Sequence, residues 1–150
     1  MNCTLSDSAT ALEDFENATS FYFGGGDDTF WASLFWEEGR NMYSREPEEL
    51  IMMKYSVNTF LALKVAYFNQ INDLCKAYNV DYDMVKYLVQ QDERIGDSHM
   101  DVTEVRGFGG HCFPKDTSAL LETAKLENVN FSILQEAVNY NNNIRDWSND

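Results

Sequence analysis

The feature that most constrains this chain is one long segment, from about residue 47 to residue 78, with apolar side chains at helical spacing. Pro47 followed by Glu48 and Glu49 favours a helix start, because proline fits the first turn and acids suit the positive end of the helix dipole. Such a helix would be roughly 45 Å long, at 1.5 Å per residue. That length exceeds what one small domain covers.

Apolar side chains nearly encircle this predicted helix. A helix that is apolar on more than one side is buried on more than one side. We therefore expect one side to pack within this chain and another to pack on a second copy, because a self-complementary patch favours a twofold dimer. The main stripe comprises Leu50, Met53, Val57, Phe60, Leu61, Phe68, Ile71, Leu74 and Cys75.

The residues before the long helix predict a small β remnant. An aromatic segment over 19–23 ends at three glycines and indicates a short strand. A helix is expected over 29–38, with Gly39 as its C-terminal glycine. A second short strand is expected over 41–44, and Thr10 opens a capping box before a very short helix.

The residues after the long helix predict further helices, so the expected fold class is mainly α. A helix over 82–91 is followed by a segment with few apolar residues, 92–106, which is expected to be loop. The next helix is expected over 117–126, with Asp116 as its N-cap. A last helix should begin with a capping box at Ser132.

Composition excludes several classes of partner. The formal net charge is −14, with 25 acidic and 11 basic side chains. Such a surface repels phosphate backbones, so nucleic acid is not an expected partner. Cys3, Cys75 and Cys112 are odd in number and widely spaced, which predicts free thiols and a reducing compartment such as the cytoplasm. No segment approaches the ~20 apolar residues of a membrane-spanning helix.

Residues 107–116, Gly-Phe-Gly-Gly-His-Cys-Phe-Pro-Lys-Asp, place one cysteine between a glycine run and a predicted helix start. Glycines allow positive φ and let backbone N–H groups approach a ligand closely. Lys115 follows Cys112 by three residues, and a nearby cation favours the reactive thiolate. One interpretation is a nucleophilic cysteine beside a backbone anion cradle. The alternative is a glycine turn with a buried cysteine and an N-cap aspartate.

Polar residues in the long helix admit two interpretations as well. Lys54 and Asn58 are four residues apart, so they share one face of the predicted helix. The functional interpretation aims both at a substrate. The alternative is a solvated lysine and a polar gap in the core. His99 and His111 have no metal-ligand spacing with each other or with the cysteines, so no metal site is predicted.

Three stretches together resemble one family, the nucleotide-sugar dehydrogenases that act on UDP-glucose or GDP-mannose. Residues 107–116 resemble the family's catalytic loop. Residues 54–62 resemble its helix with a catalytic lysine and an asparagine one turn later. Residues 92–96, Asp-Glu-Arg-Ile-Gly, resemble its Asp-x-Arg-Ile-Gly segment. The stretches occur in the family's order and at nearly its spacing, and the resemblance covers roughly residues 8–145.

The resemblance implies the domain organisation. Full members resemble a three-part plan with a Rossmann domain for NAD, a helical central domain and a second Rossmann-like domain for the nucleotide. This chain would be the helical central and dimerisation domain over 47–150, with a remnant of the end of the NAD domain over 1–46. No Gly-x-Gly-x-x-Gly follows a strand near Met1, and Asp27 and Asp28 would repel phosphate. We therefore expect no cofactor to be bound by this chain alone.

The resemblance also implies a reaction, the oxidation of a nucleotide sugar's primary alcohol to a carboxylate with two hydrides passed to NAD. Cys112 would attack the intermediate aldehyde and form a thiohemiacetal and then a thioester. Lys54 and Asn58 would stabilise negative charge on the sugar oxygen, and Asp116 would help to activate the hydrolytic water. The implied substrate-binding residues are Gly107, Phe108, Gly109, Gly110, Lys115 and Arg94, the last reaching across the dimer.

Two positions depart from the family pattern. Ser8 aligns with a glutamate used in catalysis, and Ile51 aligns with a glutamate expected three residues before the catalytic lysine. We therefore expect a truncated, dimeric dehydrogenase-like protein without oxidation activity of its own. Two alternatives stay open: an interaction protein that pairs through the long helix with a full-length dehydrogenase, and a catalytic-loop subunit of a split NAD-dependent dehydrogenase.

Overall fold

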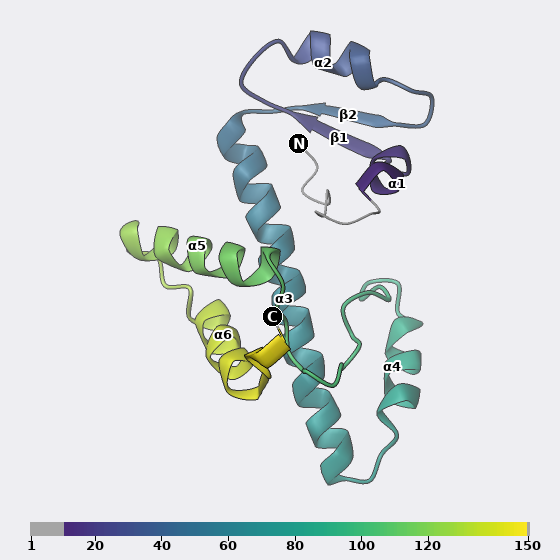
Figure 1. Ribbon diagram of the computed structural model, residues 1–150, viewed down its shortest axis with the longest axis vertical. Helices are drawn as coiled ribbons and strands as arrows, with labels where there is room; N and C mark the ends of the chain where they lie inside the picture. The colour runs from purple at the N-terminus through teal and green to yellow at the C-terminus, as the bar shows by residue number, and fades with distance from the viewer. Residues whose placement is uncertain (1–10, 150) are drawn as a thin grey trace. The chain divides into compact units, whose positions relative to one another are not determined.

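The computed structural model describes residues 11–149, which are mainly helical as predicted. The longest element is α3 (Pro47–Ala77), which matches the predicted long segment to within one residue (Figure 1). The chain forms two compact units divided after Lys54, within α3. The expected division into a 1–46 remnant and a 47–150 domain stays a prediction. Ser8 and the expected capping residue Thr10 lie outside the described residues.

The first unit contains two parallel strands joined by a helix. β1 (Ser20–Phe23) pairs with β2 (Asn41–Ser44), with Ser20 opposite Asn41 and Phe23 opposite Ser44. α2 (Asp28–Phe35) connects the strands, and α1 (Ala11–Glu16) precedes β1. Parallel strands need a crossover connection, which α2 supplies. Both strands therefore occur where the aromatic and polar pattern predicts them.

Aromatic rings hold the first unit together. The ring centroid of Phe15 lies 5.4 Å from that of Phe21 and 5.6 Å from that of Phe35. Phe21 and Phe35 stack at 5.7 Å. The guanidinium of Arg40 lies over the Phe21 ring at 5.2 Å, and its Nη2 donates to the carbonyl of Glu16 at 3.0 Å. Aromatic contacts of this kind join α1, β1 and α2 although the unit is small.

The predicted C-terminal end of the helix over 29–38 is wrong. α2 ends at Phe35, and Trp36 has extended backbone angles, φ −67° and ψ 129°. Gly39 instead has φ +90° in the turn before β2, where the Arg40 N–H donates to the Glu37 carbonyl at 3.1 Å. Glu37 and Glu38 explain the early end, because acidic side chains are unfavourable at the negative end of a helix dipole.

The second unit is built on α3. It continues with α4 (Tyr82–Gln90), α5 (Cys112–Leu126), α6 (Ser132–Ile144) and a 3-10 helix, Trp147–Asn149. Figure 1 shows α5 and α6 on one side of α3 and α4 on the other. The segment between α4 and α5 has neither helix nor strand, and it includes the predicted loop over 92–106. None of the helices described is both long and apolar enough to span a bilayer.

The core of the second unit lies where the chain before α5 crosses α3. Ala62 and Ala66 of α3 are buried against the ring of Phe108. Their small side chains leave room for the ring to pack close to the helix backbone. The partly buried residues around this centre come from α3, α5 and α6, and they are Val65, Phe113, Ala137, Val138 and Tyr140.

The predicted apolar stripe of α3 is divided between a buried and an exposed face. Phe68 and Cys75 are buried, but Phe60 is 65% exposed and Leu74 is 55% exposed in the single chain. Tyr67, between them, is 56% exposed. Phe60, Tyr67 and Leu74 are seven residues apart, so they form one line along the helix. The buried face also carries polar side chains, namely Thr59, Asn69 and Asn72.

Two predicted N-caps are wrong. α5 begins at Cys112 rather than at Thr117, so Asp116 lies inside the helix and His111 is at the N-cap without a side-chain capping bond. The reason is Pro114, which fits the first turn of a helix because its missing N–H is not needed there. Ser132 is the first residue of α6 rather than its cap. Its N–H is accepted by Oδ1 of Asn130 at 3.1 Å.

Candidate active site

Cys112 is the first residue of α5, and its thiol is free and exposed. It follows a loop in which Gly107 and Gly110 have φ values of +55° and +70°, a region that favours glycine. The first N–H groups of α5 have no side-chain cap. The positive end of the helix dipole is therefore open beside the thiol, where it can stabilise negative charge on a ligand.

Asp116 contacts two other predicted site residues, Asn58 and Lys115. Its carboxylate is fully buried, with 0% exposure. Oδ1 accepts a hydrogen bond from Nζ of Lys115 at 2.8 Å, and Oδ2 accepts one from Nδ2 of Asn58 at 2.6 Å. Hydrogen bonds to a charged group are short and strong, so the buried charge is compensated and Asn58 is oriented.

The contact between Asn58 and Asp116 joins α3 to the thiol-bearing side of α5. Cys112 and Asp116 are four residues apart in α5, so they share one face of that helix. The result is an amide, a carboxylate and an ammonium group in contact with one another, one helical turn after the residue that bears the thiol. A nucleophile beside fixed hydrogen-bond donors is the arrangement that covalent catalysis at an electrophilic carbon requires.

Phe108 anchors the cysteine loop, because its ring is 4% exposed and belongs to the core, and its predicted role in substrate binding stays a prediction. The Phe108 N–H donates to Oδ1 of Asn141 at 2.7 Å, and Nδ2 of Asn141 donates to the Phe108 carbonyl at 2.9 Å. The Gly107 N–H donates to Oδ1 of Asn69 at 3.3 Å. Sequence reasoning missed Asn69 and Asn141. The available signal was the occurrence of asparagine on otherwise apolar helix faces.

Two glycines of the loop lie close to side chains at the end of α6, so that a larger residue would require those side chains to move. A Cβ built on Gly107 would lie 2.2 Å from Oδ1 of Asn141, and one on Gly109 would lie 2.1 Å from Nη2 of Arg145. The loop and the end of α6 therefore fit each other closely. Nη1 of Arg145 also donates to the Arg106 carbonyl at 2.9 Å.

Arg94 and Lys54 are placed differently from the other predicted site residues. The side chain of Arg94 is 87% exposed, and its Nε and Nη2 donate to the carboxylate of Asp92 at 2.9 Å and 2.6 Å. This pairing raises the pKa of Arg94 and lowers the pKa of Asp92. Lys54 lies in α3 one turn before Asn58 and belongs to the first unit. Its place beside Cys112 stays a prediction.

An ion pair anchors the residue before the glycine loop. Nη2 of Arg106 donates to both carboxylate oxygens of Asp73 at 2.7 Å, which raises the pKa of Arg106. The Tyr140 hydroxyl donates to the same carboxylate at 3.2 Å. Burial raises the pKa of Tyr140, and the charge of Asp73 adds to the effect. Arg106 has φ +57°, so its unfavourable backbone conformation is held by these contacts.

His99 packs against the first turn of α5. Its ring centroid lies 5.7 Å from that of Phe113, the residue after Cys112. Burial lowers the pKa of His99, and the charge of Lys64 lowers it further. Nδ1 of His99 is buried without a hydrogen-bond partner. These conditions favour the neutral imidazole.

The expected absence of a metal site and of a bound dinucleotide stays a prediction. Within residues 11–149, no cluster of three or more histidine, cysteine or acidic side chains is suited to holding a metal. The glycine turn after β1 leads into α2, where Oδ1 of Asp27 accepts the Phe30 N–H at 3.0 Å and Asp28 begins the helix. These carboxylates occupy the position that a pyrophosphate would need at the helix N-terminus.

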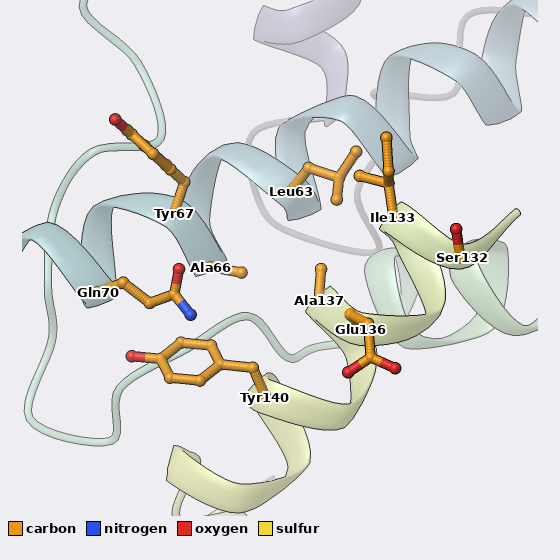
Figure 2. A pocket seen from close by; sticks show the side chains of 9 residues that line it. All are labelled: Leu63, Ala66, Tyr67, Gln70, Ser132, Ile133, Glu136, Ala137 and Tyr140. Carbon is orange, nitrogen blue, oxygen red and sulfur yellow. The ribbon is translucent and has the colours of Figure 1, made fainter.

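A groove of about 430 Å³ lies between α3 and α6, and none of the predicted site residues is among its lining residues. Figure 2 shows its two walls, with Tyr67 and Gln70 on α3 and Glu136 and Tyr140 on α6. It is an open surface feature, and none of its lining residues belongs to the cysteine loop. It is linked to the loop through Ala66, which packs against Phe108, and through Tyr140, whose hydroxyl contacts the Asp73 that holds Arg106.

Comparisons with known proteins agree on one group. Residues 48–143 match the model of the UDP-glucose/GDP-mannose dehydrogenase family, central domain. UDP-glucose 6-dehydrogenase YwqF of Bacillus subtilis is 36% identical over 102 residues, which are 68% of this chain and 23% of that protein. UDP-glucose 6-dehydrogenase AglM of Haloferax volcanii is 31% identical over 149 residues, 94% of this chain and 34% of that protein.

A solved structure shows the same similarity in three dimensions. The UDP-glucose dehydrogenase of the archaeon Pyrobaculum islandicum superposes with a TM-score of 0.80 at 32% sequence identity. The match covers 89% of this chain and 31% of that one. This chain thus spans only about a fifth to a third of the length of the proteins it matches.

Proposed function

This chain belongs to the UDP-glucose/GDP-mannose dehydrogenase family through its central domain, and from that premise we propose that it forms the cysteine-bearing half of a nucleotide-sugar site. The observation that carries the proposal is the contact between Asn58 of α3 and Asp116 of α5, one turn from Cys112. The expected ligand is a nucleotide sugar, and the names of the relatives favour UDP-glucose.

Cys112 is the nucleophile in this proposal. Its thiolate attacks the aldehyde carbon of an oxidised sugar, a C–S bond forms, and the electron pair of the carbonyl moves to its oxygen. Asn58, oriented by Asp116, and Lys54 stabilise the resulting negative charge. Lys115 compensates the negative charge of the buried Asp116. After oxidation of the intermediate, Asp116 holds the water that attacks the captured carbon. Gly107, Gly109 and Gly110 line the substrate, and Phe108, whose N–H and carbonyl are both bonded to Asn141, anchors their loop.

Capture of a supplied aldehyde needs no hydride acceptor, but both oxidation steps, from alcohol to aldehyde and from thiohemiacetal to thioester, do. Removing hydride from the captured intermediate requires an acceptor, which NAD supplies in this chemistry. The turn over Gly24–Gly26 and the carboxylates of Asp27 and Asp28 do not fit a dinucleotide. We therefore propose that the 150 residues bind a nucleotide sugar and capture an aldehyde but do not reduce NAD by themselves.

The second part of the proposal is a homodimer through α3. Phe60, Tyr67 and Leu74 form an exposed apolar line on the longest helix of the chain. Exposed apolar lines of this kind are typical of protein interfaces. The high exposure of Arg94 is compatible with a role in the partner's site, where its guanidinium would contact the substrate. The free thiols of Cys75 and Cys112 support a reducing compartment such as the cytoplasm.

Ligand protection of Cys112 tests the site. The protein is alkylated with iodoacetamide with and without UDP-glucose, GDP-mannose or NAD, and modification of each cysteine is followed by mass spectrometry. We expect UDP-glucose to slow alkylation of Cys112, and NAD to have no effect. A bound sugar nucleotide should also stabilise the fold by ~2.7 kcal/mol at a hundredfold excess over Kd.

The test variant is Asp116→Asn. It removes the carboxylate charge that orients Asn58, so it should weaken the protection of Cys112 by UDP-glucose. Equal alkylation of Cys112 with and without both sugar nucleotides would exclude the proposed site. Reduction of NAD by the purified chain with UDP-glucose would contradict the proposed lack of independent oxidation.

The same exposed line supports a second candidate function, pairing with a full-length dehydrogenase. A helix that is complementary to its own copy is also complementary to a close relative, because the contact surfaces are similar. Mixing tagged full-length dehydrogenase with this chain and measuring mixed dimers by native mass spectrometry tests the idea. The absence of exchange after dissociation and reassociation would count against it.

A further inference from the structure

The stretch that leads into the cysteine loop is held by side chains rather than by a helix or strand. Residues 105–109 pass between α3 and α6, and Arg106 and Gly107 both have left-handed backbone angles, φ +57° and +55°. A left-handed conformation is accessible to Gly107 but is unfavourable for Arg106 unless its surroundings hold it. The side chains that hold this stretch therefore decide where the loop, and with it Cys112, is placed.

Asn141 of α6 provides the central contact. Its side chain is fully buried, with 0% exposure. Oδ1 accepts the Phe108 N–H at 2.7 Å, and Nδ2 donates to the Phe108 carbonyl at 2.9 Å. One amide thus satisfies both polar backbone groups of Phe108, as a neighbouring strand would do in a sheet. The ring of Phe108 is at the same time buried against Ala62 and Ala66 of α3.

Other residues of α3 and α6 hold the flanks of this stretch. Asp73 pairs with Arg106, and Arg145 donates to the Arg106 carbonyl at 2.9 Å. The Asp146 N–H donates to the Val105 carbonyl at 2.9 Å. Of these contacts, the one made by Asn141 lies nearest to Cys112 along the chain, because its partner Phe108 is four residues before the thiol. Asn141 also sets the shape of the loop, since a Cβ on Gly107 would lie 2.2 Å from its Oδ1.

We propose that Asn141 is a positioning residue that fixes the location of the Cys112 thiol by holding the backbone of Phe108. This inference rests on the proposed function, in which Cys112 is the nucleophile. Asn141 is buried beneath the loop and acts on the reaction only through Phe108. Asn58, in contrast, is placed against the substrate by the proposed function and acts on it directly.

The test compares variants that keep two, one or none of the Phe108 bonds. Wild type keeps both. Asn141→Asp keeps an acceptor for the Phe108 N–H but, when its carboxyl is ionised, has no donor for the Phe108 carbonyl. Asn141→Leu keeps neither bond and has a similar volume. The neighbouring Asn142 is exposed, so Asn142→Asp and Asn142→Leu are matched controls.

The measurement is the ligand-free rate at which iodoacetamide modifies Cys112, followed by mass spectrometry and compared with a synthetic peptide of residues 107–116. We expect the wild-type rate to differ from the peptide rate by about fivefold or more, because the folded environment sets thiol reactivity. Asn141→Leu should come close to the peptide rate, Asn141→Asp should be intermediate, and both Asn142 variants should match wild type.

Thermal unfolding of each variant separates positioning from general stability. The inference holds if the alkylation rates follow the number of Phe108 bonds, whatever the order of unfolding midpoints. It is overturned if Asn141→Leu, folded at the assay temperature, keeps the wild-type rate, if wild type already reacts like the peptide, or if the rates follow the midpoints instead.

The two proposals fail in different ways. If UDP-glucose gives wild type no protection, the nucleotide-sugar site is excluded, while the ligand-free rates still decide whether Asn141 positions the thiol. If protection occurs but the Asn141 variants react like wild type, the site stands and the positioning role is rejected.

Discussion

Asp116 is a carboxylate inside a helix, fully buried, with Asn58 and Lys115 as hydrogen-bond donors. Burying a charge is unfavourable unless strong hydrogen bonds compensate for the lost hydration. Here the compensating groups are themselves predicted site residues. The stability of the fold and the geometry of the proposed site therefore depend on the same contacts.

We predict that Asn58→Ala destabilises the protein by about 1–3 kcal/mol, because a buried charged acceptor loses a donor. In the Asp116→Asn background the same substitution should cost clearly less. Urea unfolding of the two single variants and the double variant gives this coupling energy. The exposed Asn142→Ala should change stability by no more than about 0.5 kcal/mol. Additive effects of the two substitutions would show that the contact contributes nothing.

His99 makes the fold sensitive to acid. Burial and the charge of Lys64 lower the pKa of His99 in the folded state below its unfolded value of about 6.5. The unfolded chain therefore binds more protons in that range, and stability falls as pH drops through about 6.5. We predict that the unfolding midpoint decreases between about pH 7 and pH 5, and that His99→Phe shows a smaller decrease. Identical pH profiles for both proteins would contradict this assignment.

At the scale of elements, α3 carries three roles on different faces. Ala62 and Ala66 form the core with Phe108, Asn58 and Asn69 hold the site loop and α5, and Phe60 with Tyr67 is exposed. This division explains why apolar residues nearly encircle the helix. The predicted single stripe was too simple, because the buried face needs small and polar side chains to admit the loop closely.

The outer face of α3 predicts the behaviour of one variant. Phe60→Glu places a charge in the proposed dimer interface, so we expect it to shift the protein to monomer while the fold stays intact. Sedimentation velocity measures the change. Leu126→Glu is the control, because Leu126 is 72% exposed on α5 and outside this face. A Phe60→Glu protein that remains dimeric would place the interface elsewhere.

For the molecule as a whole, the dominant property is its charge. The net charge of −14 means that two copies repel each other at long range. The proposed dimer is therefore held by apolar contact against electrostatic repulsion. Added salt should therefore strengthen the dimer, because it screens the repulsion between the two copies.

We predict that the dimer becomes several-fold tighter as ionic strength rises from about 0.01 M to about 0.15 M, because the Debye length falls from about 30 Å to about 8 Å. The dissociation constant from sedimentation or light scattering across that range tests this. Weakening of the dimer by salt would show that ion pairs, rather than apolar side chains, hold the copies together.

Local patterns were sufficient for most elements and for the family. The long helix, both strands and the loop over 92–106 follow from periodicity, aromatic content and sparse apolar residues, all of which act over short distances. The match of residues 48–143 to the family model agrees with three short motifs. The start of α5 was misjudged because Pro114 is compatible with either a loop or a first helical turn.

The sequence by itself determined the helical fold and the small two-stranded sheet, because these depend on neighbouring residues. Only the tertiary structure decided that Asn58 donates to a buried Asp116, and that Asn141 and Asn69 hold the backbone before Cys112. The partners in these contacts are separated by 33 to 58 positions in the chain. Asparagine also has the same local preferences whether it is exposed or buried, so its partner is decided only when distant helices pack together.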